Sequence, residues 1–107
     1  SSKDKIMPRF EMHLMIAEKS DDRFETVQYD IVCFVKDPTD MVEIESSANE
    51  IITDHLQDAE NVVLFGTAVV EIRGQEVFNI AFQNKDANQE EVNRIIDLCI
   101  LGEETIH

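Results

Sequence analysis

Apolar and polar residues alternate in the first third of the chain, and this period of two constrains the fold most. Phe10, Met12, Leu14 and Ile16 occupy every second position, and Val27 to Val35 repeats the pattern. A period of two predicts strands with one face directed inward. The polar residues Lys19 to Asp22 separate the two stretches, which suits a hairpin connection.

A second hairpin and a helix are predicted in the later half. Residues 61–72 are β-branched and apolar on both faces, as in a central strand, and 77–83 form the next strand. Arg73-Gly74 between them suits a tight turn. A helix should follow Asp86, because apolar residues then recur at helical spacing. These residues are Val92, Ile95, Ile96, Cys99 and Ile100.

Residues 41–46 fit two interpretations. Val42 and Ile44 could lie on one face of a short strand, or a helix could begin at Asp40. Ser46-Ser47 is unfavourable inside a helix, whereas Ser47 to Glu50 matches a capping box. We therefore favour a short strand followed by a helix from Ser47 to about Ala59.

These elements predict an α+β protein. We expect an antiparallel sheet of four to five strands, with two helices packed on one face. The order is two strands, the optional short strand, a helix, two strands and a helix. Residues 1–6 are read as a tag remnant or a disordered start, and 7–107 as a single α+β domain.

The net charge of −14 is concentrated in one part of the chain. Residues 1–36 carry 7 acidic and 6 basic side chains, whereas 37–107 carry 16 and 3. This imbalance argues against nucleic acid or an anionic membrane as a direct partner, since both require a basic surface. It suits a basic protein partner, including one that normally binds nucleic acid. Without a long apolar run or a leader-like segment, we expect a cytoplasmic protein.

Catalytic and metal-binding motifs are not recognisable. The chain has no nucleophile elbow, phosphate-binding glycine loop or C-x-x-C motif, so we expect a non-enzymatic protein without a cofactor. His13, His55 and His107 have no ligand spacing, so no metal site is expected either.

Acidic residues on the first predicted helix are the distinctive feature. Glu50, Asp54 and Asp58 recur at intervals of four, and Glu43 and Glu45 precede them. They form either a solvated face or a surface that docks on a basic protein. In the second interpretation they imitate a row of phosphates, as in small acidic inhibitors of nucleic-acid-handling proteins, which are often phage-encoded. That comparison concerns charge and size alone.

An assembly role is the main alternative. Met15 and Phe34 are predicted on the outer face of the sheet, and Leu98 and Leu101 lie outside the inward stripe of the last helix. These four residues could cover the free sheet face through a homodimer. A small-molecule site between sheet and helices is a third possibility.

Overall fold

The computed structural model describes the backbone of residues 7–20, 23–58 and 62–106, and the side chains of 7–19, 23–58 and 62–98. Residues 1–6, for which a tag remnant was expected, lie outside this range. The elements follow one another as β1 (Arg9–Ser20), β2 (Arg23–Phe34), α1 (Met41–Leu56), β3 (Val62–Ile72), β4 (Gln75–Gln83) and α2 (Gln89–Ile106).

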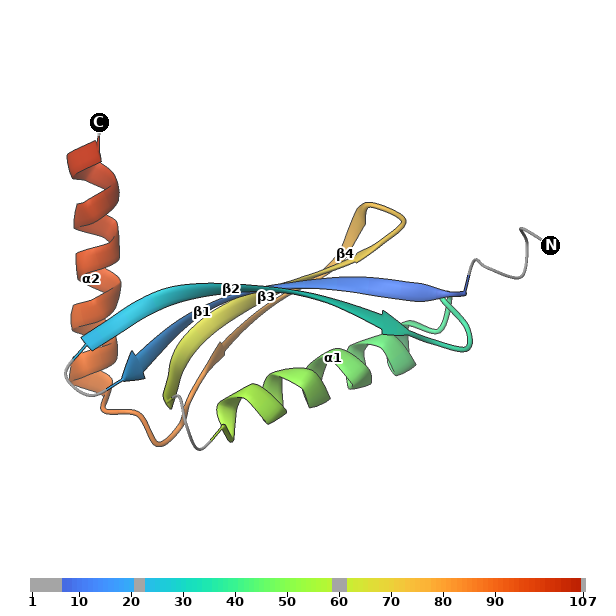
Figure 1. Cartoon of the computed structure of the whole chain (residues 1–107), viewed down its shortest axis with the longest axis horizontal. Helices are drawn as coiled ribbons and strands as arrows, with labels where there is room; N and C mark the ends of the chain where they lie inside the picture. Colours follow the sequence, from blue (N-terminus) through green and yellow to red (C-terminus); the bar gives the residue numbers. More distant parts are fainter. Residues whose placement is uncertain (1–6, 21–22, 59–61, 107) are drawn as a thin grey trace.

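The predicted α+β class and element order are confirmed. The four strands form one antiparallel sheet in the order β2-β1-β3-β4, so the strands of the two hairpins meet through β1 and β3 (Figure 1). Arg73 and Gly74 form the β3–β4 turn with positive φ angles of 53° and 79°. Two successive residues of this conformation match the twist of the strands that they join.

The core lies between the sheet and α1. Phe10, Met12, Leu14 and Ile16 are at most 1% exposed, which confirms that the even positions of β1 point inward. They pack in one cluster with three residues of α1, namely Ile44, Ala48 and Ile52. We call this covered side of the sheet the inner face and the opposite side the outer face.

Helix α1 begins earlier than the sequence suggested. The short strand favoured for residues 41–46 is wrong, since the helix starts at Met41. The Asp40 side chain accepts a hydrogen bond from the Glu43 amide at 3.1 Å, which caps the first turn. Ile44 is fully buried at this end of the helix. Capping and burial together outweigh the weak helix preference of the two serines.

The two helices meet the sheet differently. Figure 1 shows α1 along the inner face, whereas α2 stands at one end of the sheet and extends away from it. The first turns of α2 hold it there: Val92 and Ile95 pack on Leu64, and Lys19 Nζ lies 2.9 Å from a Glu91 carboxylate oxygen. Thus α1 alone covers most of the inner face. In the described part of the chain, neither helix is long and apolar enough to cross a membrane.

Candidate functional site

The acidic residues singled out in the sequence are held mainly by α1. Glu45, Glu50 and Asp54 are exposed on the helix, and Glu43 is half-buried in its first turn. Asp58 was expected on the same helix, but α1 ends at Leu56, so that prediction is wrong. The regular stripe of three residues is therefore shortened to Glu50 and Asp54.

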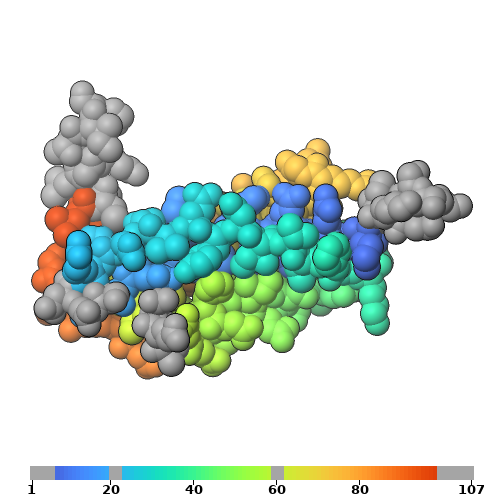
Figure 2. All heavy atoms as spheres, in the orientation of Figure 1, coloured from blue at the N-terminus to red at the C-terminus, as the bar shows by residue number. Residues whose placement is uncertain are grey.

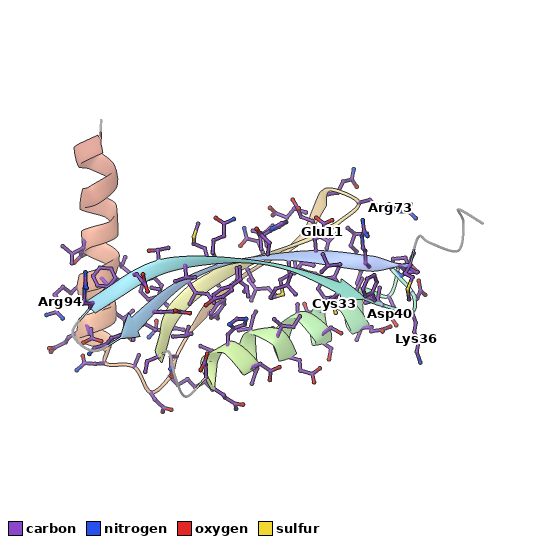
Figure 3. All side chains as sticks on the ribbon, viewed as in Figure 1. Glu11, Cys33, Lys36, Asp40, Arg73 and Arg94 are labelled. Carbon is purple, nitrogen blue, oxygen red and sulfur yellow. The ribbon has the colours of Figure 1, made fainter. Side chains whose placement is uncertain are left out.

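These carboxylates occupy two flanks of α1. At 3.6 residues per turn, Glu43, Glu50 and Asp54 share one flank, and Glu45 lies on the other. Burial, together with the negative charges of Glu43 and Glu50, raises the pKa of the Cys33 thiol on β2. The flank with three carboxylates therefore faces the β2 edge of the sheet. Figure 3 shows Cys33 between that strand and α1, and Figure 2 shows the two elements side by side.

The segment of the chain that holds these carboxylates lacks lysine and arginine. The sequence contains no lysine or arginine from 37 to 72. Within the described part of the chain, the structure records no ion pair for Glu43, Glu45, Glu50 or Asp54. Repulsion between Glu50 and Asp54, one turn apart, costs about 0.2–0.5 kcal/mol. The surface of α1 is thus an anionic strip on a helix fixed by its buried side.

The residues expected at an oligomer interface are exposed but separated. Met15 is 47% exposed and Phe34 is 57% exposed, both on the outer face. Phe34 lies opposite Arg9 in the sheet, six residues from Met15 along β1, or roughly 20 Å. Leu98 is 49% exposed on α2, and the side chain of Leu101 lies outside those described. The described residues therefore do not form one compact patch.

A polar cluster between those apolar residues was not anticipated. His13 lies between carboxylates of both neighbouring strands, with Nδ1 2.7 Å from Asp30 Oδ1 and Nε2 2.9 Å from Glu71 Oε1. Glu11 belongs to the same group, since ligand atoms of Glu11, His13 and Glu71 lie within 4.8 Å of one another. We call these three residues and Asp30 the His13 cluster.

The electrostatics of the His13 cluster follow from these contacts. Hydrogen bonds to Asp30 and then Glu71 raise the pKa of His13 above its usual value. The same contact with His13 lowers the pKa of Asp30. The sequence contains one sign of this cluster, because Glu11 and His13 are two residues apart and therefore lie on the same, outward side of β1. Their partners come from other strands, so the spacing of the histidines could not reveal the group.

A second polar contact lies on the inner face. Glu18 is 7% exposed and accepts a hydrogen bond of 2.9 Å from the Tyr29 hydroxyl. This bond, followed by burial, raises the pKa of Tyr29. The Tyr29 ring also contacts His55 of α1, with ring centroids 5.0 Å apart. These contacts join β1, β2 and α1 and have a structural role.

We compared the chain with protein families, curated proteins and solved structures. No family model, curated protein or solved structure matches the chain.

Proposed function

We propose that the protein is a non-enzymatic binding module that docks the acidic surface of α1 on a basic protein. The observation that carries this proposal is a group of carboxylates that form no ion pair within the described part of the chain, on a helix anchored by Ile44, Ala48 and Ile52. Anchoring matters because charges on a rigid element need little ordering when a partner binds.

A basic protein that handles nucleic acid is the favoured partner. Glu50 and Asp54 are separated by about 6 Å along the helix axis, and Glu43 and Asp54 by roughly 16 Å. A basic groove built for phosphates meets a similar series of negative charges on nucleic acid. The protein would then act as a nucleic-acid mimic that blocks its partner's groove.

The test compares two charge-reversal variants as baits for host proteins. The first changes Glu43, Glu50 and Asp54, which share one flank of α1, to lysine. The control changes Glu76, Asp86 and Asp97, which are exposed elsewhere, so both variants carry the same net charge. Proteins retained from a lysate of the native host are eluted with a salt gradient and then challenged with DNA.

We expect a basic protein to be retained on the wild type and on the control, but not on the α1 variant. Salt and DNA should both release it, because the contact is electrostatic and occupies a nucleic-acid site. Equal retention by both variants would show that overall charge, and not α1, holds the protein. Retention that resists salt would also argue against the proposal.

Homo-oligomerisation is the second candidate, favoured by the exposure of Met15, Phe34 and Leu98. Here Phe34→Asp or Leu98→Asp should lower the solution mass, whereas charge reversal on α1 should leave it unchanged. Mass measurements at low and high salt separate the two candidates. An assembly held by apolar contacts is insensitive to salt, and a chain that stays monomeric contradicts this candidate.

A further inference from the structure

The register of the sheet brings three metal-binding side chains together on the outer face. Glu11 and His13 point to that face because they are two residues apart on β1. Glu71 of β3 is paired directly with Glu11 and lies diagonally from His13, which is paired with Val69. A diagonal neighbour is within reach of a long side chain. The sheet itself therefore assembles the group from two adjacent strands.

The chemistry of this group differs from that of an ordinary acidic patch. One imidazole nitrogen and two carboxylates are ligands that zinc and similar transition metals accept, whereas Mg²⁺ and Ca²⁺ prefer oxygen alone. Neighbouring ligands around tetrahedral zinc are about 3.4 Å apart, given bond lengths near 2.1 Å. The ligand atoms of Glu11, His13 and Glu71 already lie within 4.8 Å, so small side-chain rotations suffice.

Asp30 supplies the partner that a metal-binding histidine normally has. It lies opposite His13 in the β1–β2 register, and its Oδ1 is 2.7 Å from Nδ1. A carboxylate on one ring nitrogen fixes the orientation of the imidazole and leaves the other nitrogen to bind the metal. That other nitrogen, Nε2, is the one directed at Glu71, at 2.9 Å.

We propose that Glu11, His13 and Glu71 bind one divalent transition metal of the zinc class, with Asp30 as the positioning residue. The metal replaces the proton that joins His13 Nε2 to Glu71. The side chains of His13 and Glu71 are 35% and 29% exposed, which leaves a fourth position for water. The site lies on the face opposite α1, so it is independent of the proposed docking surface.

The carboxylates of the His13 cluster could instead be neutralised by nearby arginines, without a metal. Arg9 and Arg73 line a pocket together with Glu11 and Glu71, and Figure 3 shows Glu11 on the outer face and Arg73 at the nearby turn. Guanidinium groups there offset part of the carboxylate charge without any metal. Moreover, a chain with a net charge of −14 attracts divalent cations over its whole surface. The test must therefore separate a defined site from general attraction.

The test is a calorimetric titration of the metal-free full chain with Zn²⁺, with Mg²⁺ as the comparison and Co²⁺ as a spectroscopic probe. His13→Gln and Glu71→Gln each remove one ligand. Asp30→Asn changes the positioning residue alone. The matched control, Glu50→Gln with Asp54→Asn, removes two negative charges from α1 and leaves the cluster intact. Thermal unfolding in a chelator shows that every variant is folded.

We expect one Zn²⁺ per chain, bound at least about tenfold more tightly than Mg²⁺, with ligand-field absorption when Co²⁺ is bound. His13→Gln and Glu71→Gln should each weaken Zn²⁺ binding by more than tenfold, and Asp30→Asn should weaken it by about tenfold. The α1 control should change it less than twofold. Equal binding by wild type and His13→Gln, or equal affinity for Zn²⁺ and Mg²⁺, would overturn the proposal.

Discussion

The exposed side of α1 and the outer face of the sheet differ in how they could recognise another molecule. The α1 surface carries carboxylates for which the structure records no ion pair among the residues that it describes. The outer face combines exposed Met15 and Phe34 with charges that are paired inside the His13 cluster. Unpaired charge acts over a distance and is weakened by salt, whereas apolar and ligand contacts act at short range. The two surfaces therefore suit different partners.

The largest expected effect comes from loosening α1. Ile44→Ala leaves a cavity where a fully buried side chain joins the helix to the sheet. It should lower the free energy of unfolding by about 2–5 kcal/mol. Met15→Ala on the outer face should change it by less than about 0.5 kcal/mol. Urea denaturation of both variants measures the contrast, and equal losses would show that the outer face is also packed.

Tyr29→Phe tests the polar contact beneath α1. The variant leaves the buried carboxylate of Glu18 without the hydroxyl that bonds it, so it should cost about 1.5–3 kcal/mol at neutral pH. Thr67→Ala, on the exposed outer face, is the matched loss of a hydroxyl and should have little effect.

Tyr29→Phe should also change how the stability of the protein depends on pH. The pKa of Tyr29 is raised in the folded state, so its contribution is present below the unfolded value of about 10 and is lost as pH rises through the folded value. Alkaline titration should therefore destabilise the wild type more than Tyr29→Phe. Parallel stability curves above pH 10 would be inconsistent with this assignment.

The cap of α1 has a smaller effect. Asp40→Ala removes the acceptor for the Glu43 amide and should cost about 1 kcal/mol. Asp40→Asn keeps an acceptor and should remain close to the wild type. Hydrogen exchange should show that the backbone amides of the first turn lose protection in Asp40→Ala, while those of the rest of α1 keep it. No change in Asp40→Ala would refute the role of this side chain.

The acidic surface itself should slightly reduce stability. Asp54→Lys places a lysine four residues after Glu50, which replaces repulsion with attraction. We expect a gain of about 0.5 kcal/mol at low ionic strength that disappears in 1 M salt. A loss of stability would mean that Asp54 has a structural role, and the interpretation of this carboxylate as a docking residue would weaken.

Local patterns predicted most of the fold. The alternation from Phe10 to Ile16 determined which face of β1 is buried, and Arg73-Gly74 marked the β3–β4 turn. The start of α1 could not be predicted from local preference, because Ser46 and Ser47 disfavour a helix, whereas the cap at Asp40 and the burial of Ile44 favour one. Tertiary packing decides such cases, and a short window of sequence does not contain it.

The candidate sites were predictable to different degrees. The exposed acidic residues of α1 follow from helical spacing, although the end of the helix removed Asp58 from the series. The His13 cluster depends on the pairing of β1 with both β2 and β3. A shift of one residue in either register would separate Asp30 or Glu71 from His13. Such a contact requires the folded sheet.

Carboxyl footprinting of the partner-bound protein tests the central claim most directly. A carbodiimide labels exposed carboxylates, and mass spectrometry compares the free protein with the complex formed by the retained basic protein. Our account predicts that labelling falls at Glu50 and Asp54 and is unchanged at Glu76 and Asp97. Unchanged labelling on α1, with protection on the outer face instead, would contradict it.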